Sequence, residues 1–453
     1  MRLTKTRAAA ALAISATLAL SACGGGSSNN AGDGGQTSGS DSSQGSTQGG
    51  NSKDVEVFTW WAAGGEKAGL DGMVSVFDKQ CSQYHFVNAA VAGGGGDKAK
   101  TLLANNLEAG NPPSTFQAHA GGELTDYIAN NQVQDITSLF KENGFDKAFP
   151  QDLVDQLTVN GKIYSVPANI HRANMVWVNP KVLKKAGINP NQAPASVQAW
   201  ISDLAKLKKA GVEHPLAMSK GFAEEMLMET TLLGDLGVDK FNGLWDGSTK
   251  WDSKEVTSAL NDFKTLMSYT NSDRDTMDWD AALAKYVFPK SGEAQAGYQV
   301  MGDWVPAQLM TLNVPDSAYT YWPAPGTDGV YQWLSDSFTL PVNGKDPEGA
   351  KCWLKVVGSA EGQKAFNTKK GSIPARTDAN PKDYPKYQQW AMKQWKSSKL
   401  APSMAHGSAG PGAWNNDIQT AMSAFSSNPD VGKLQGTLVT LAQKYSSWKK
   451  TLG

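Results

Sequence analysis

Hydrophobic residues follow two different spacings along the first third of the globular sequence. Three runs rich in apolar and β-branched residues are expected to be strands: 55–61, 84–92 and 114–119. A segment with helical spacing follows each run: 67–81, 97–110 and 121–132. In the first helix, for example, Leu70, Met73 and Phe77 fall on one face. This alternation predicts an α/β protein with parallel strands and right-handed crossovers.

The pattern continues to the C-terminus without an internal repeat. Further helices are expected at 195–211, 254–270 and 347–371, and further strands at 318–325 and 337–342. Gly371 closes the last helical run, as glycine commonly does after a helix. The length from residue 54 onward indicates two or three domains.

Two adjacent tryptophans, Trp60 and Trp61, stand where the first strand ends. Neighbouring residues of a strand point to opposite faces, so the two rings cannot fill one side of the same core. Either both faces of a buried strand are packed, or one ring lines a cleft. Ligands of open α/β sheets bind beyond the carboxyl ends of strands, which makes the second interpretation attractive.

The first residues predict export from the cytoplasm. A short basic region precedes an apolar run at 8–20 that is too short to span a bilayer, and small residues follow it. Residues 1–22 are therefore expected to be a signal peptide. The sequence Leu-Ser-Ala-Cys at its end resembles the bacterial lipobox, which implies diacylglycerol on Cys23. A secreted protein with an incidental cysteine is the alternative.

Residues 23–53 are expected to form a flexible, lipid-anchored linker. Residues 24–52 consist almost wholly of small and polar residues, which cannot bury enough apolar surface to fold. A coil of this length reaches roughly 30 Å. This tether would hold the globular part at the extracellular face of the cytoplasmic membrane.

Charge and cysteine content narrow the possibilities further. The formal net charge is −1 and no basic stripe is present, so we expect no nucleic-acid partner. Besides Cys23, only Cys81 and Cys352 remain. Outside the cytoplasm they could form a disulfide or remain two buried thiols.

Motifs of common enzymes and cofactor sites are missing. There is no G-x-S-x-G elbow, no H-E-x-x-H motif and no P-loop ending after the glycines at 93–96. The acidic stretch 273–280 lacks the glycine of an EF-hand loop, so a solvated loop is expected. We therefore predict no metal and no cofactor. Two carboxyl groups that meet in space could still form a glycoside hydrolase site.

Polar and aromatic residues at expected element ends have the chemistry of a sugar site. Sugar hydroxyls both donate and accept hydrogen bonds, and charged, amide and imidazole groups can match them. The apolar face of a pyranose can lie against an indole ring, and the chain has 15 tryptophans. The candidates are Trp60, Trp61, Glu66, Gln117, His119, Asn169, His171, Asp303, Trp304, Asp336, Lys370 and His406.

Six segments carry a resemblance to a known family. They read FTWWAAGGE, TFQAHAG, SVPANIHRAN, VMGDW, LSDSF and KKGSIPAR. With them the chain resembles the extracellular solute-binding proteins of bacterial ABC sugar importers, and more narrowly the glucose-type monosaccharide binders. The resemblance extends from about residue 55 to the last helix.

This resemblance implies a two-lobe periplasmic-binding-protein-like fold of type II, with the ligand in a cleft between the lobes. Three hinge segments would cross near 166–171, 325–336 and 371–376. Lobe 1 would comprise 54–168 and 331–373, and lobe 2 would comprise 169–330 and 374–453. Cys81 and Cys352 would then lie in the same lobe, where they can pair.

The resemblance also implies roles for the candidate residues. Trp304 and Trp279, which precedes an insertion at 287–297, would sandwich the sugar ring. Asn169 and His171 could serve the hinge rather than the ligand. Two features depart from the family pattern: one extra residue between Trp61 and Glu66, and the insertion at 287–297. Both bear most on which sugar is bound.

The function expected from these residues is capture without chemistry. A monomer would bind one monosaccharide, glucose or galactose, and deliver it to the ABC permease subunits in the membrane. A glycoside hydrolase that uses Glu66 and Asp336 is one alternative. A sugar-binding module of a sensor kinase or an adhesin is another.

Overall fold

The computed structural model describes residues 53–93 and 96–448 and contains two main sheets. The first, five-stranded sheet has the order β2-β1-β3-β13-β6. Its strands are β1 Asp54–Phe58, β2 His85–Asn88, β3 Thr115–His119, β6 Ser165–Pro167 and β13 Asp336–Thr339. We call this sheet with its helices the first lobe. β1, β2 and β3 are parallel, as expected, whereas β13 pairs antiparallel with both β3 and β6.

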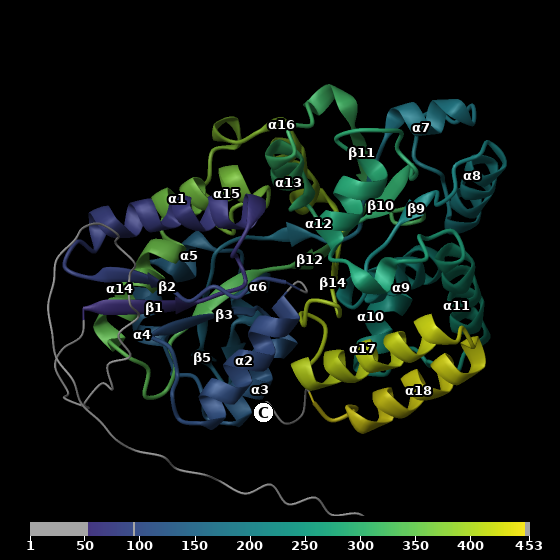
Figure 1. Cartoon of the computed structure of the whole chain (residues 1–453). Helices are drawn as coiled ribbons and strands as arrows, with labels where there is room; N and C mark the ends of the chain where they lie inside the picture. Colours follow the sequence, from purple (N-terminus) through teal and green to yellow (C-terminus); the bar gives the residue numbers. More distant parts are fainter. Residues whose placement is uncertain (1–52, 94–95, 449–453) are drawn as a thin grey trace, which may run out of the picture. The chain divides into compact units, whose positions relative to one another are not determined.

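Helices cover the first sheet in the positions that the periodicity predicts. They are α1 Gly64–Gln80, α2 Asp97–Glu108, α3 Gly122–Ala129, α14 Pro347–Gly358 and α15 Ala360–Lys370. α1 and α15 lie side by side although they are far apart in sequence (Figure 1). The expected single helix at 347–371 is wrong in one respect, because it breaks at Ser359. The side chain of Ser359 accepts a hydrogen bond from the Gly362 N–H and starts α15 as a new helix.

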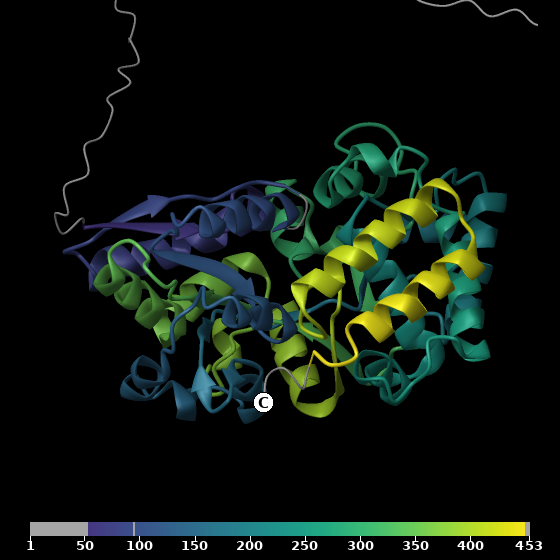
Figure 2. The ribbon, with the colours of Figure 1, turned by 90° about the horizontal axis from the view of Figure 1, so that it is seen from below.

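The second sheet is smaller and belongs to what we call the second lobe. Its strand order is β11-β8-β10-β9, with β8 Met175–Val178, β9 Leu216–Ala217, β10 Tyr298–Val300 and β11 Thr320–Pro323. Around it pack the helices α8 Val197–Lys209, α9 Phe222–Leu236, α10 Val238–Asp246, α11 Lys254–Met267, α17 Gly412–Ser427 and α18 Val431–Lys444. The last two form an antiparallel pair, clear in the view from below (Figure 2).

Three chain segments connect the lobes and bond to one another. The first crossing includes β7 His171–Arg172, which pairs with β12 Val330–Leu334 of the second crossing. β12 also pairs with β14 Lys399–Pro402, which follows the third crossing in the sequence. Ile170 and Ile373 exchange two backbone hydrogen bonds of 2.8 and 3.0 Å. The crossings expected near 166–171, 325–336 and 371–376 therefore meet in one place.

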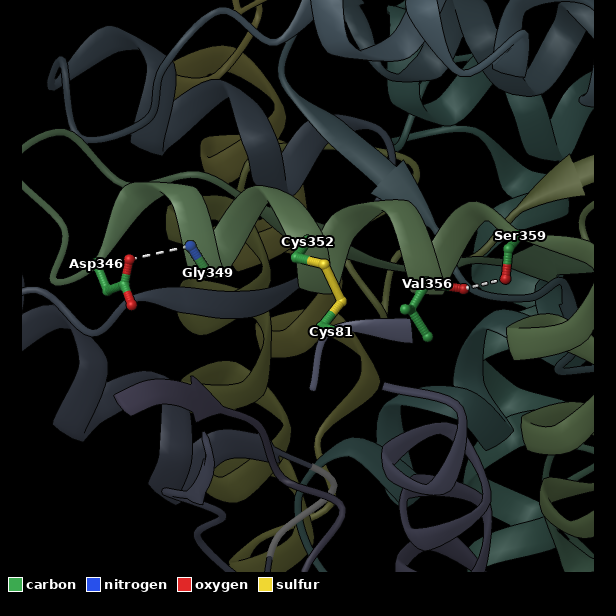
Figure 3. Close-up of a disulfide and its surroundings, with 6 residues drawn as sticks. All are labelled: Cys81, Asp346, Gly349, Cys352, Val356 and Ser359. Atoms are coloured by element: carbon green, nitrogen blue, oxygen red, sulfur yellow. Dashed lines mark hydrogen bonds between the residues drawn. A yellow bond between two sulfur atoms is a disulfide. The ribbon is translucent and has the colours of Figure 1, made fainter. Parts of the chain in front are cut away.

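Cys81 and Cys352 form a disulfide between the end of α1 and the middle of α14 (Figure 3). α14 begins at the N-cap Asp346, whose carboxylate accepts the Gly349 N–H. Of the two interpretations left open by the sequence, the structure has the disulfide, within the first lobe.

The predictions for the signal peptide, Cys23 and most of the linker fall outside the described residues. Within the described ranges, no helix has both the length and the apolar character needed to cross a bilayer. No group of His, Cys, Asp and Glu suited to a metal ion is found there either.

Replacing Cys352 by Ser should lower the free energy of unfolding by about 2–5 kcal/mol, because the disulfide closes a very long loop and restricts the unfolded chain. Thermal unfolding of the variant and of the wild type, each with and without reductant, measures this. Reductant should lower the midpoint of the wild type only. Equal midpoints for oxidised wild type and variant would contradict the stabilising role.

Candidate functional site

A small cavity lies where the two lobes and the crossing segments meet. The space between its wall atoms amounts to about 340 Å³, a volume that includes open solvent at its mouth. The side chains that line it are Trp60, Glu66, His119, His171, Phe222, Trp279, Trp304, Leu334, Asp336, Lys370 and His406. Nine of these eleven are candidates from the sequence; Phe222 and Leu334 are not.

The nine come from both lobes and from the crossings. Trp60 and Glu66 lie just after β1 and in the first turn of α1. His119 and Asp336 lie at facing ends of β3 and β13 and are register partners. Lys370 is the last residue of α15 in the first lobe. The remaining four are at element ends or in loops of the second lobe and crossings: His171, Trp279, Trp304 and His406.

Four other candidates do not line the cavity, and this corrects the expectation that they contact a ligand. Trp61 is fully buried and its ring packs 4.4 Å from Phe366 and 5.5 Å from Phe338, centroid to centroid. The strand has already ended at Phe58, so the alternation argument does not apply to the two rings. Gln117, Asn169 and Asp303 lie directly behind residues that line the cavity, as their hydrogen bonds show.

Asp336 is the most heavily bonded of the lining groups. Its Oδ1 accepts from Gln117 Nε2 at 2.8 Å, and its Oδ2 accepts from Asn169 Nδ2 at 2.7 Å. Its backbone N–H donates to Asn169 Oδ1 at 2.9 Å. These bonds fix the carboxylate at the junction of β3, β13 and the first crossing.

Two histidines add positive potential around this carboxylate. His171 Nε2 lies 3.4 Å from Asp336 Oδ2, and His119 Nε2 lies 3.6 Å from Oδ1. Burial alone would raise the pKa of Asp336, but the hydrogen bond and charge of His171, with the charges of His119 and Lys370, hold it well below the usual range. Asp336 is therefore ionised at neutral pH.

His171 connects Asp336 to the second lobe. Its Nδ1 forms a short hydrogen bond with Asp303 Oδ1, and Tyr387 donates to the other oxygen of Asp303 at 3.2 Å. Burial alone would lower the pKa of His171, but the charge and hydrogen bond of Asp303 raise it. Asp303 thus orients the imidazole from behind the cavity wall.

Ion pairs hold the other charged groups in and around the cavity. Lys370 Nζ donates to Glu66 Oε1 at 2.8 Å, so the extra residue before Glu66 still leaves the acid at the cavity. Lys100 Nζ and His119 Nδ1 each lie 2.8 Å from Glu123 Oε2. Burial alone would raise the pKa of Glu123, but Lys100 and His119 lower it to about 2. Lys100 and Glu123 were not among the sequence candidates.

The aromatic wall differs from the expected sandwich. The rings of Trp279 and Trp304 have centroids 6.4 Å apart at an interplanar angle of 72°, which is direct edge-to-face contact. No sugar ring fits between two rings in that arrangement, so the expected sandwich is wrong for this structure. The two indoles instead form a corner. The inserted residues 287–297 do not line the cavity, and Trp279 stays there.

The two lobes approach each other closely near the cavity. At Gly65, near the start of α1, an added Cβ would lie 2.3 Å from the Cβ of Ala307 in α13, Val305–Thr311. α1 belongs to the first lobe and α13 to the second, so the lobes are in contact here. A second hollow next to this contact shares four of the lining residues: Trp60, Glu66, Trp279 and Trp304.

The arrangement is suited to holding a small polar molecule with an apolar face. It offers charged donors and acceptors from several directions beside indole rings. Asp336 is held ionised by its hydrogen bonds and neighbouring charges, which is opposite to what a general acid needs.

The comparisons with known proteins agree with this geometry. Residues 65–364 match the family model described as bacterial extracellular solute-binding protein. The chain belongs to this family. The solute-binding protein has the two-lobe fold expected for it, and its place of action is outside the cytoplasm.

Relatives and solved structures give the same picture. An ABC transporter extracellular-binding protein of Pyrococcus horikoshii is 33% identical over 86% of this chain and 88% of its own. A probable sugar-binding periplasmic protein of Mesorhizobium japonicum is 30% identical over 82% of this chain and 89% of its own. The fold is similar to that of a bacterial solute receptor reported to prefer β-D-galactopyranose, with a TM-score of 0.75 and 20% sequence identity. The match covers 88% of this chain and all of that one.

Replacing Asp336 by Asn should destabilise the solute-binding protein by about 3–5 kcal/mol at neutral pH, because a partner of a buried ion pair is lost. The pKa of Asp336 is lowered in the folded state, so its contribution is present above about pH 4 and is lost as the pH falls further. Urea unfolding at neutral and acid pH tests this. The difference in free energy of unfolding between wild type and variant should shrink in acid. A difference that does not depend on pH would contradict an ionised, paired Asp336.

Proposed function

We propose that this protein captures a monosaccharide, glucose or galactose, and delivers it to the permease of an ABC importer. The observation that carries the proposal is the composition of the inner cavity. Ionised Asp336, Lys370 and the imidazoles face an indole corner in a small cavity. The probable sugar-binding relative at 30% identity supports sugar as the ligand class.

The hydrogen-bond inventory supports a polyhydroxylated ligand. Lys370 and His171 supply donors, whereas Asp336 and Glu66 supply acceptors. Each sugar hydroxyl can accept from one group and donate to another. Bonds to ionised partners are the stronger ones, which favours tight capture from dilute solution.

Lobe closure would couple capture to transport. A ligand that contacts both lobes gains its full set of contacts only in the closed arrangement, so it shifts the population toward that arrangement. The permease would engage the closed lobes. We place the lobe boundaries at 54–168 with 331–373 and 169–330 with 374–453, which keeps each main sheet within one lobe.

The protein would act as a monomer tethered through a diacylglyceryl group on Cys23 at the extracellular face of the cytoplasmic membrane. The small size of the inner cavity favours one sugar unit. The adjoining hollow, about 1,050 Å³ with its open side, shares part of the wall of this cavity. Trp60 and Trp304 line both spaces.

The hydrolase alternative receives no support from the carboxyl groups. Glu66 is paired with Lys370, and Asp336 is kept ionised, whereas a glycosidase needs one protonated carboxyl as its acid. A role in a sensor or an adhesin uses the same binding site, and only the partner protein separates it from import.

Replacing Trp304 by Ala should weaken sugar binding by about 1–3 kcal/mol, because a buried aromatic contact with the sugar face is lost. Calorimetric titration of wild type with a panel of monosaccharides and disaccharides identifies the ligand and gives the reference affinity. Trp448→Ala is a matched control, since this half-buried indole bonds to the Trp245 carbonyl away from the cavity. Equal affinities in wild type and Trp304→Ala would contradict the site.

Incubation of the protein with disaccharides should release no reducing sugar. The physical reason is that no lining carboxyl is placed to give a proton to a glycosidic oxygen. A reducing-sugar assay against a known glycosidase checks this. Turnover that is lost in Asp336→Asn would overturn the transport proposal in favour of hydrolysis.

A further inference from the structure

His406 has a polar atom that no protein group satisfies. The ring lines the inner cavity, and its Nε2 is buried without a hydrogen-bond partner. Its Nδ1 lies 2.8 Å from the hydroxyl of Ser403. Nε2 is therefore the atom that His406 has available for a ligand.

A buried carboxyl stands behind this pair. The hydroxyl of Ser403 lies 2.6 Å from Oε1 of Glu229, which is on α9 and does not reach the cavity. Oε2 of Glu229 accepts the backbone N–H of Met404 at 2.7 Å and of Ala405 at 3.4 Å. Glu229, Ser403 and His406 thus form a continuous row from the core of the second lobe to the cavity.

The single hydroxyl hydrogen of Ser403 makes the row an all-or-none arrangement. When Glu229 is ionised, Ser403 donates to Oε1, so His406 Nδ1 must carry a proton and donate to Ser403. Nε2 is then a bare acceptor. When Glu229 is protonated on Oε1, it donates to Ser403, Ser403 donates to Nδ1, and the ring proton is on Nε2.

We propose that Glu229 is a positioning residue that sets, through Ser403, whether His406 presents an acceptor or a donor to the ligand. The proposal rests on the sugar-binding function proposed above and adds how the cavity chooses one hydrogen-bond direction. It also makes ligand affinity depend on pH.

The change between the two arrangements balances with one proton. It enters at Nε2, the Nδ1 proton passes to the oxygen of Ser403, and the hydroxyl proton of Ser403 passes to Oε1 of Glu229. The ring stays neutral throughout, and the buried carboxylate loses its charge.

The surroundings favour a neutral ring and a titratable acid. The pKa of His406 is well below its usual value, chiefly because the ring is buried. The charges of His119, Lys100 and His171 lower this pKa further, and only the charge of Asp336 raises it. Burial raises the pKa of Glu229 to about 7, although the hydrogen bonds from Ser403, Met404 and Ala405 oppose the rise.

Two other acids are near this part of α9: Glu225 on the helix itself and Asp97 on α2. Glu225 lies one turn before Glu229 on the same helix, and the charge of Glu229 is among the causes that, after burial, raise its pKa well above the usual value. Two charged residues of α2 also act on Glu225: Asp97 raises its pKa and Lys100 lowers it. Burial therefore favours the uncharged form of Glu225, and Glu229 is the acid whose oxygen reaches Ser403.

The acceptor arrangement is the one that suits the ligand. The cavity already has strong donors in Lys370 and in His171, whose pKa is raised. A hydroxyl that accepts from one of these donors still has its own hydrogen to place, and a bare Nε2 accepts it. Affinity should therefore fall as the pH drops through the range in which Glu229 takes up its proton.

The variant Glu229→Gln fixes the donor arrangement. The backbone N–H groups of Met404 and Ala405 require the amide oxygen, so the amide nitrogen must face Ser403. We expect about tenfold weaker binding of the tightest sugar than in wild type near pH 8, as for the loss of one hydrogen bond, and no further change toward pH 5.5. Wild-type affinity should approach that of the variant in acid. Glu224→Gln, on the same helix, is the matched control, since Glu224 bonds to Ser426 and Arg274 instead.

Nitrogen-15 NMR of the ligand-free protein tests the row without any sugar. The chain has five histidines, and the loss of one signal set in His406→Asn assigns this ring. We expect Nδ1 protonated in wild type at alkaline pH, Nε2 protonated in acid, and Nε2 protonated at every pH in Glu229→Gln. A doubly protonated ring, or a tautomer that is the same in both proteins, would overturn this inference. Absence of sugar binding would overturn the proposed function and leave the tautomer result intact.

Discussion

The buried carboxylate of Asp336 is the constraint on which the site depends. Gln117 and Asn169 bond to it from β3 and from the first crossing, and His171 approaches it on the way to Asp303 in the second lobe. A buried charge costs several kcal/mol unless it is paired and hydrogen-bonded, so these groups cannot move independently. The partners that one carboxylate needs therefore hold the start of β13, the first crossing and one wall of the cavity in fixed positions relative to one another.

The need to pair buried charges also explains why the polar side chains of the cavity wall have fixed orientations. Nearly every charged group at its wall already has a protein partner, as Lys370 has in Glu66 and His119 in Glu123. Such groups are oriented before a ligand arrives, which lowers the entropy cost of binding. Because the walls come from both lobes, their full set exists only when α1 and α13 are in contact. In the proposed function, capture and closure would then be two descriptions of one equilibrium.

Sequence patterns predicted much of this, for identifiable reasons. The strand and helix spacing located β1 to β3 and their helices, because period and turn residues are local signals. Trp60, Glu66 and His406 are candidates from their places at expected element ends, but only the family resemblance assigns them to one site, since their neighbours in space are far away in sequence. Local signals also failed where long-range packing decides. Trp61 enters the core against Phe366, and Trp279 meets Trp304 edge to face. Phe222 and Glu229 read as ordinary helix residues, and nothing near them in sequence indicates a cavity.

The central claim is that a single sugar unit binds beside Asp336 between the lobes. A crystal structure of the protein with its tightest-binding monosaccharide tests this most directly. The account predicts the sugar in the inner cavity, with hydroxyl oxygens within hydrogen-bond distance of Asp336 and Lys370 and one ring face against Trp304 or Trp60. A sugar found only in another hollow, such as the one lined by Trp333 and Trp395, with the inner cavity holding water, would contradict it.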